Sequence, residues 1–231
     1  MISVLLPVMN EVKSLNLTIE LLEGLNPFTS FEHIIILSQF STKESIENAR
    51  RLEIRHAGKV QVILQDLPGL GGALQSGIRR AKGNYILMMA TDLETDPHAV
   101  PELVATCLEF PGAIISTTRW RNQSAGFVGY GKVKMIFNWL FQRFLGILYQ
   151  TSLTDLTYGF RLYPSEVIKR ELWQRTDFAF LLESILVPLR NNVQVVEIPV
   201  VWKRREEGQS SNSIKLMIKY LFVAIKLRIN Q

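Results

Sequence analysis

Short apolar runs rich in β-branched residues alternate with segments of helical periodicity through the first half of the chain. The runs predict strands over about 2–6, 33–37, 59–65, 84–90 and 113–117, with helices over about 10–25, 41–56, 68–83 and 97–110. Pro7 is expected to stop the first strand and Asn10 to cap the first helix. This β-α repetition predicts a doubly wound α/β fold with a mostly parallel sheet. In such a sheet ligands bind outside the carboxyl ends of the strands, which here follow Leu6, Leu37, Gln65, Ala90 and Thr117.

The pattern changes after Thr118. Residues 119–149 are dense in aromatic and basic side chains and contain no acid. A strand or turn is expected around 159–163, a helix over 178–190 and an extended run over 193–202. The simplest partition is one domain over 1–212, followed by a basic amphipathic helix over 213–231.

Composition excludes several classes of protein. With 231 residues, 47% hydrophobic and 20% charged, the chain has enough apolar material for a sizeable core and is not disordered. The single cysteine, Cys107, forms no internal disulfide and no structural zinc site, which favours the cytosolic side. The sequence shows neither a secretory signal nor an apolar run of the ~18–20 residues that a spanning helix needs.

The net charge of +5 is unevenly distributed. Residues 119–150 carry five basic residues and no acid, whereas residues 201–231 carry seven basic residues and two acids. Each of these regions therefore has a charge of +5, and the rest of the chain has −5. The pattern predicts two basic patches that bind an anionic partner, apart from an acidic first half.

Three alternating carboxylates, Asp92, Glu94 and Asp96, follow the fourth predicted strand. Hard oxygen ligands at a strand end can hold Mg²⁺ or Mn²⁺ against a substrate diphosphate. The alternative is an ordinary helix start, with Asp96 capping ahead of Pro97.

Glycines after the third predicted strand, in Gly69-Leu70-Gly71-Gly72, can cradle an anion at a helix N-terminus. A tight turn with close helix packing is at least as good an explanation, because the full dinucleotide and P-loop spacings are missing.

The remaining candidate site residues are arginines, and the sequence offers no nucleophile. Arginines at 119, 121, 161, 204 and 205 suit bidentate phosphate contacts, although each alone is more often a surface or ion-pair residue. Three scattered histidines and one cysteine give no nucleophilic triad, so hydrolase chemistry of that kind is disfavoured.

The order of these motifs resembles the family 2 glycosyltransferases, in the branch of dolichol-phosphate mannose synthase-like and polyprenyl-phosphate glycosyltransferases. The matching motifs are Pro7-x-x-Asn10-Glu11, Gly69-Leu70-Gly71-x-Ala73, Asp92-Leu93 before Pro97, Ser116 to Arg119, Asp155-x-x-x-Gly159-Phe160-Arg161, Glu183, and Arg205-x-x-Gly208-x-Ser210. The resemblance implies a GT-A fold, a nucleotide-diphosphate sugar donor, a divalent metal (Mg²⁺ or Mn²⁺) and transfer with inversion to a polyprenyl phosphate. The anionic acceptor phosphate can then attack without a dedicated general base.

Site residues follow from the same resemblance, position by position. It places Pro7, Met9, Glu11, Gly69, Gly71 and Arg119 at the nucleotide sugar, Asp92 and Glu94 at the metal, Arg119, Arg205 and Ser210 at donor or acceptor phosphates, and Asp155 and Arg161 on the acceptor side. Asp92, Asp155 and Arg161 are accordingly the expected catalytic residues.

The chain also departs from the family pattern. Ser38 and Gln39 stand where the family has paired acids, Ala90 replaces the first acid of the D-x-D motif, and Ser211 replaces a frequent Lys. The alternative function is therefore a catalytically silent module that binds a nucleotide sugar or a lipid phosphate and positions a partner enzyme.

Two apolar segments suit a membrane interface, and the lipid-phosphate acceptor that the resemblance implies favours a peripheral place on the cytoplasmic face of the inner membrane. Residues 135–149 and the terminal helix combine apolar and basic side chains, as interfacial helices do, while core packing with snorkelling cations is the alternative. A nucleic-acid partner is not expected, because the sequence contains no recognised binding module.

Overall fold

The computed structural model describes residues 1–25, 30–121, 127–128, 131–203 and 214–229. The described elements are β1 (Ile2–Val8), α1 (Lys13–Gly24), β2 (Phe31–Leu37), α2 (Lys43–Arg55), β3 (Val60–Leu64), α3 (Gly69–Arg80), β4 (Tyr85–Met88), η1 (Pro97–Ala99), α4 (Val100–Glu109), β5 (Ile114–Thr118), β6 (Phe127–Val128), α5 (Lys132–Tyr149), β7 (Arg161–Pro164), α6 (Ser165–Arg170), α7 (Phe180–Arg190), β8 (Val195–Pro199), β9 (Trp202–Lys203) and α8 (Ile214–Ile229).

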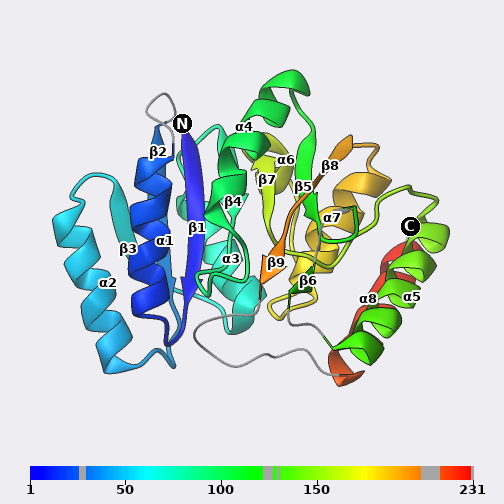
Figure 1. Ribbon diagram of the computed structural model, residues 1–231, viewed down its shortest axis with the longest axis horizontal. Helices are drawn as coiled ribbons and strands as arrows, with labels where there is room; N and C mark the ends of the chain where they lie inside the picture. Colours follow the sequence, from blue (N-terminus) through cyan, green and yellow to red (C-terminus); the bar gives the residue numbers. More distant parts are fainter. Residues whose placement is uncertain (26–29, 122–126, 129–130, 204–213, 230–231) are drawn as a thin grey trace.

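Seven strands form one twisted sheet in the order β3-β2-β1-β4-β7-β5-β8 (Figure 1). β7 is antiparallel to both of its neighbours, β4 and β5, and the other pairs are parallel. β6 and β9 pair as a separate two-stranded ribbon. The predicted α/β class with a mostly parallel sheet is confirmed.

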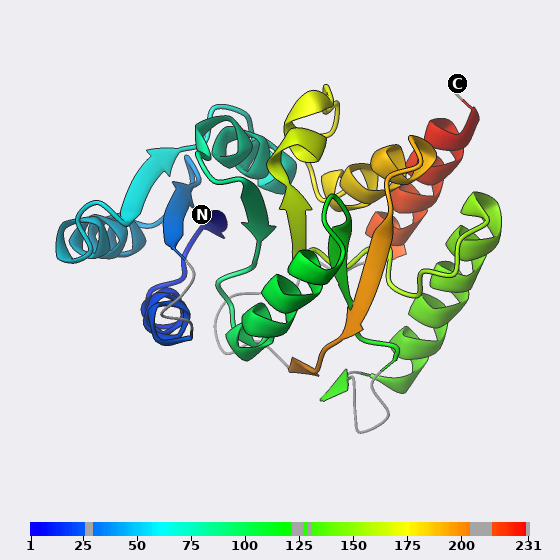
Figure 2. The ribbon, with the colours of Figure 1, turned by 90° about the horizontal axis from the view of Figure 1, so that it is seen from above.

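The sheet is covered on both faces (Figure 2). Side chains of α1, α2 and α4 pack with Val4, Leu6 and Ile35 on one face, and those of α3, α6 and α7 pack with Leu5 and Ile34 on the other. Neighbouring residues of β1 and β2 thus face opposite layers, and both layers are apolar. This explains the unbroken apolar runs in the sequence.

β1 and α1 begin and end differently from the expectation. β1 continues through Pro7 to Val8. Backbone groups of Leu5 and Pro7 point toward β4, whose pairing with β1 ends at Leu5, so the missing N–H of Pro7 breaks no bond of the ladder. α1 begins at Lys13 with Val12 at its N-cap and no side-chain cap, so Asn10 does not cap it.

α5 and α8 pack against each other beside α7 (Figure 1). The Tyr149 hydroxyl of α5 donates to the carbonyl of Ala224 at 2.8 Å, and Tyr220, Val223 and Ala224 of α8 are buried in the core. The division at residue 213 stays a prediction, but the described part of α8 packs as a component of the domain.

Candidate active site

The loops that follow β1, β2 and β4 contact one another at the carboxyl edge of the sheet. The Ser41 hydroxyl donates to the carbonyl of Val8 at 3.0 Å, and the amide of Thr42 donates to the carbonyl of Met9 at 3.3 Å. From the other side, the Thr91 hydroxyl donates to the carbonyl of Pro7 at 3.3 Å. The loops at the expected ligand edge are therefore joined to one another by hydrogen bonds, and Ser38, Gln39 and Ala90 occupy the positions where the family has acids.

The proposed nucleotide residues lie at the end of β1. Met9 is 49% exposed, and the Glu11 carboxylate accepts the backbone amides of Met9 at 2.8 Å and Asn10 at 3.0 Å. Glu11 thus shapes its own loop and leaves the Met9 side chain open to a ligand. Their contact with a nucleotide base stays a prediction.

Asp92 begins a tight, strained segment after β4. It is only 8% exposed, and its Oδ1 accepts the amide of Glu94 at 3.1 Å. Leu93 between them has φ of +57°, in the left-handed region that non-glycine residues rarely adopt. Such strain is found disproportionately at ligand sites, because surrounding contacts must hold it in place.

Asp96 is committed to its own neighbours. Its Oδ1 accepts the backbone amide of His98 at 3.0 Å and lies 2.7 Å from the ring Nδ1, and Oδ2 lies 3.6 Å from the Lys203 ammonium. Burial opposes ionisation, but these partners hold the pKa of Asp96 below its usual value. The position of the Asp96 carboxylate is explained by its role as a helix cap. Asp92 and Glu94 come earlier in the chain and do not cap this helix.

The oxygen ligands offered by the carboxylate segment fit a metal ion only when a diphosphate supplies further ligands. No group of three His, Cys, Asp or Glu side chains able to hold an ion occurs in the described part of the chain. Two carboxylates, from Asp92 and Glu94, are nevertheless the complement that Mg²⁺ commonly uses when substrate phosphates and water supply its other ligands.

A buried ion pair joins Arg119 at the end of β5 to Asp155. The guanidinium donates from Nε to Oδ2 at 2.6 Å and from Nη2 to Oδ1 at 2.9 Å, and the Arg119 amide also donates to Oδ2 at 3.3 Å. Arg119 and Asp155 are 7% and 0% exposed. This bidentate geometry fixes the guanidinium plane as well as its position.

Tyr158 connects this pair to the carboxylate segment. The Arg119 guanidinium carbon lies 4.6 Å from the centre of the Tyr158 ring, and the Tyr158 hydroxyl lies 2.7 Å from that of Thr95. Burial raises the pKa of Tyr158 well above its ordinary value, so the phenol stays neutral. The structure therefore brings Asp92, Glu94, Arg119 and Asp155 into one region.

Polar side chains of β8 and α5 hold the segment that contains Asp155 through hydrogen bonds. The side chain of Glu197 of β8 is 1% exposed and accepts the amides of Thr154 at 2.8 Å and Asp155 at 2.9 Å, and the Thr154 hydroxyl at 2.9 Å. Burial raises the pKa of Glu197 although these donors oppose the shift. From α5, Gln142 donates to Thr157 at 2.7 Å and accepts the amide of Leu156 at 2.9 Å.

Arg161 lies in the core rather than at the edge. It is fully buried, and its guanidinium donates to the Ser116 hydroxyl at 3.1 Å, to the carbonyl of Leu156 at 2.8 Å and to the carbonyl of Leu181 at 2.6 Å. It therefore ties β5, the 156 turn and α7 together. A direct contact of Arg161 with acceptor is not what this placement favours, and its catalytic role stays a prediction.

Gly69 and Gly71 lie against the loop before α7. A Cβ on Gly69 would be 2.5 Å from the carbonyl oxygen of Thr176, and a Cβ on Gly71 would be 2.6 Å from that of Arg175. The amide of Gly72 already donates to the Thr176 carbonyl at 2.8 Å. Close packing thus accounts for these glycines, and contact with a donor stays a prediction. Arg205 and Ser210 lie outside the described residues.

Three residues of this region are missing from the sequence-based set: Tyr158, Glu197 and Gln142. Weak signals existed for two of them. Glu197 is the lone acid in the run Val195-Val196-Glu197-Ile198, and Gln142 is a polar residue inside an apolar helical segment. Neither signal names the partner, which lies 42 residues from Glu197 and 13 from Gln142 in the sequence.

Large apolar side chains are exposed on both α5 and α8. They are Val133, Ile136, Phe137, Trp139, Leu140, Phe144 and Ile147 on α5, and Ile218, Phe222, Ile225 and Ile229 on α8, with exposures from 36% to 79%. We call this set the apolar face. No described helix is long and apolar enough to cross a membrane.

Comparison with known proteins agrees with this architecture. Undecaprenyl-phosphate 4-deoxy-4-formamido-L-arabinose transferases of Edwardsiella ictaluri and Proteus mirabilis are each 26% identical to the chain over 96% of its length. The chain spans 66% and 65% of those two relatives. A crystal structure of glucosyl-3-phosphoglycerate synthase from Mycobacterium tuberculosis, in complex with Mn²⁺, uridine diphosphate and phosphoglyceric acid, superposes with a TM-score of 0.76 at 16% identity, covering 99% of this chain and 78% of that one.

The structural likeness supports the GT-A fold expected from the sequence. The model of the glycosyl transferase family 2 matches residues 3–172, which is most of the sheet together with the Asp92 segment and the Arg119–Asp155 pair. The chain therefore belongs to the glycosyl transferase family 2.

Proposed function

We propose that this chain transfers a sugar, with inversion, from a nucleotide-diphosphate sugar to a polyprenyl phosphate at the cytoplasmic face of the inner membrane. The observation that carries the proposal is the Arg119–Asp155 pair placed next to the Asp92 segment at the carboxyl edge of a family 2 sheet. The names of the relatives, which are transferases acting on undecaprenyl phosphate, support the acceptor class.

Each residue has a distinct part in this reaction. A phosphate oxygen of the acceptor forms the new bond to the anomeric carbon of the sugar while the bond to the diphosphate breaks, and the nucleoside diphosphate leaves. Arg119, held in one orientation by Asp155 and the Tyr158 ring, is placed to bind an anionic phosphate. A divalent cation held by Asp92 and Glu94 would neutralise charge on the leaving diphosphate.

Substrate screening tests the activity. Wild-type protein is incubated with undecaprenyl phosphate, Mn²⁺ or Mg²⁺ and a panel of UDP- and GDP-sugars, including a nucleotide-linked 4-deoxy-4-formamido-L-arabinose, and donor binding is followed by calorimetry. Turnover of at least one donor is expected. Binding of a donor without turnover would favour the silent module suggested by Ser38, Gln39 and Ala90. Binding of no donor, with or without metal, would refute both functions that involve a nucleotide sugar.

Asp92→Asn tests the metal assignment. Loss of one carboxylate from a diphosphate-bridged ion should lower turnover by about 100-fold or more, since such charge stabilisation contributes several kcal/mol. Asp96→Asn is the matched control in the same segment, because Asp96 is engaged by His98 and Lys203. Equal loss in both variants would contradict a specific role for Asp92.

The apolar face is proposed to dock on the membrane. Ile147 on α5 and Ile54 on α2 are both 79% exposed, which provides a matched pair. Burying an isoleucine in the acyl boundary is worth about 1.5–3 kcal/mol, so Ile147→Ser should weaken vesicle binding by about tenfold or more, whereas Ile54→Ser should leave it unchanged. Equal vesicle binding by both variants would contradict membrane docking by the apolar face.

A further inference from the structure

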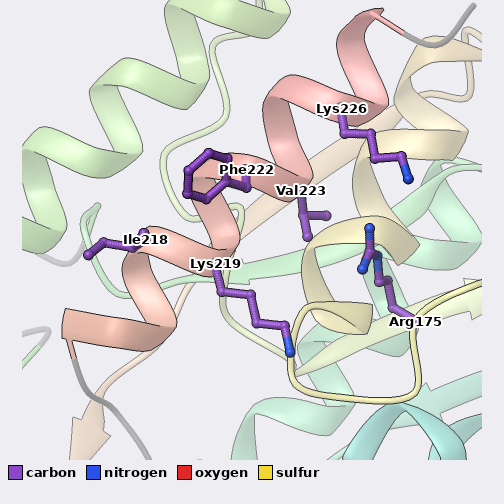
Figure 3. A pocket seen from close by; sticks show the side chains of 6 residues that line it. All are labelled: Arg175, Ile218, Lys219, Phe222, Val223 and Lys226. Atoms are coloured by element: carbon purple, nitrogen blue, oxygen red, sulfur yellow. The ribbon is translucent and has the colours of Figure 1, made fainter.

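A cationic hollow separates the loop before α7 from helix α8. It has a volume of about 330 Å³ and is lined by Arg175 of that loop and by Ile218, Lys219, Phe222, Val223 and Lys226 of α8 (Figure 3). Three of the six lining residues carry a positive charge. None of the six belongs to the region of Asp92, Glu94, Arg119 and Asp155, although Ile218 and Phe222 belong to the apolar face.

The positive charge of the hollow is only partly compensated. Lys219 pairs with Asp177 at 2.5 Å, and the pair lowers the pKa of that carboxyl against the effect of burial. No described carboxylate lies within ion-pair distance of Arg175 or Lys226. The lining residues carry three cations and no acid, and the neighbouring Asp177 and Glu183 carboxylates, which both interact with Arg175 electrostatically, offset part of that charge.

The backbone of Arg175 is held in a fixed position. Its amide donates to the buried Glu183 carboxylate at 3.0 Å, and its carbonyl accepts from the Gln75 side chain of α3 at 2.8 Å. The opposite wall is fixed as well, because the Tyr220 hydroxyl donates to the carbonyl of Phe178 at 2.9 Å. The backbone on both sides of the hollow is thus fixed by the fold.

Apolar side chains border the cations. Figure 3 shows Lys219, Lys226 and Arg175 on one side of α8, with Ile218 and Phe222 extending to the other side. Ile218 and Phe222 are 51% and 69% exposed and belong to the apolar face. A ligand of this surface therefore needs an anionic group next to an apolar group.

The spacing of the cations favours an extended anionic surface. Lys219 and Lys226 are seven residues apart on one helix, which is two turns or about 10 Å. A single terminal phosphate is compact, whereas the headgroup layer of a bilayer offers anionic groups over such a span. We propose that this hollow binds the headgroup phosphates of anionic phospholipids, with Ile218 and Phe222 entering the acyl boundary. The inference rests on the proposed membrane docking but does not depend on the transfer reaction.

Vesicle binding of the full chain tests the inference. Vesicles of phosphatidylcholine are compared with vesicles of phosphatidylcholine mixed with phosphatidylglycerol. Each basic residue near an anionic surface contributes roughly fivefold in affinity, so Arg175→Gln with Lys226→Gln should weaken binding to the mixed vesicles about 25-fold. The control is Lys43→Gln with Arg51→Gln on α2, which removes the same charge from exposed positions and should change binding little.

Three results would overturn the inference. Equal weakening in both double variants would mean that net charge alone drives binding. A raised KM for polyprenyl phosphate in the hollow variant, with unchanged vesicle binding, would mean that the hollow holds the acceptor. Saturation of the hollow by inorganic phosphate, with no preference for phosphatidylglycerol vesicles, would mean that it binds a free anion. Failure of the transferase alone would show as intact vesicle binding without turnover, and thermal melts verify that all variants fold.

Discussion

Glu197 offers a sharp test of how the site is held together. Its carboxylate is buried behind Asp155 and accepts two backbone amides, those of Thr154 and Asp155, at 2.8 Å and 2.9 Å through the same oxygen. The second oxygen accepts the Thr154 hydroxyl at 2.9 Å. Glu197→Ala removes all of these acceptors, while Glu197→Gln can keep the amide oxygen where both backbone donors meet.

The difference between the two variants follows from unsatisfied donors. A buried polar group left without its partner costs about 1–3 kcal/mol, and Glu197→Ala leaves two backbone amides in that state, so the free energy of unfolding should fall by about 2–6 kcal/mol. Glu197→Gln should lose about 1–2 kcal/mol, from one ordinary hydrogen bond and the half-exposed ion pair of Glu197 with Arg121 at 3.6 Å. Both variants should still fold, because neither substitution removes an apolar side chain from the core.

Urea unfolding monitored by circular dichroism measures these losses. A shift of the midpoint at constant slope reports a change in stability alone. The exposed acid Glu109 on α4 supplies the control Glu109→Ala, expected within about 0.5 kcal/mol of wild type. Turnover adds a second readout, because displacement of Asp155 should misplace Arg119 in Glu197→Ala and spare it in Glu197→Gln. Equal stability of the two variants would refute this reasoning.

Two more predictions concern the fold. Gly71→Ala should cost about 1–3 kcal/mol in urea unfolding, because its Cβ would lie 2.6 Å from the Arg175 carbonyl oxygen, whereas Gly24→Ala, with nothing within 4 Å, should stay within about 1 kcal/mol; similar losses would contradict the packing argument. Burial lowers the pKa of His33 although Glu23 opposes the shift, so the unfolded chain binds this proton first. The contribution of neutral His33 to the free energy of unfolding is then present above about pH 6.5 and is lost as the pH falls below it. His33→Gln should therefore reduce the dependence of this free energy on pH in unfolding measured from about pH 7 to about pH 5. An unchanged dependence on pH would exclude His33 as its source.

The carboxylate segment shows how far the sequence could lead. Asp92, Glu94 and Asp96 directly follow one apolar run, so the sequence placed them at the end of one strand. In a parallel sheet that end lies at the edge where ligands bind. The sequence also offered Asp96 as the cap of a helix that begins at Pro97, and the structure confirms that role, but the sequence did not show which cation faces it. Its partner Lys203 lies 107 residues away, and only the fold brings that ammonium within 3.6 Å.

Arg161 and Arg119 illustrate the same limit from opposite directions. Both look alike in sequence, as arginines in motifs that suit phosphate binding. β7 inserts antiparallel between β4 and β5, which buries Arg161 among neutral acceptors, while Arg119 follows the end of β5 and meets Asp155 at the edge. Strand order depends on packing between distant segments, which local pattern does not encode.

The class of fold and the two basic regions could be read from the sequence, because periodicity and charge are local properties of the chain, and the edge of the sheet at which a ligand binds stays a prediction. Tertiary structure alone decided which polar residues meet: Asp155 with Arg119, Glu197 behind Asp155, and Arg175 facing Lys219 and Lys226 across a hollow. The physical reason is that a buried or cationic side chain takes its role from partners, and those partners come together only when segments far apart in sequence pack.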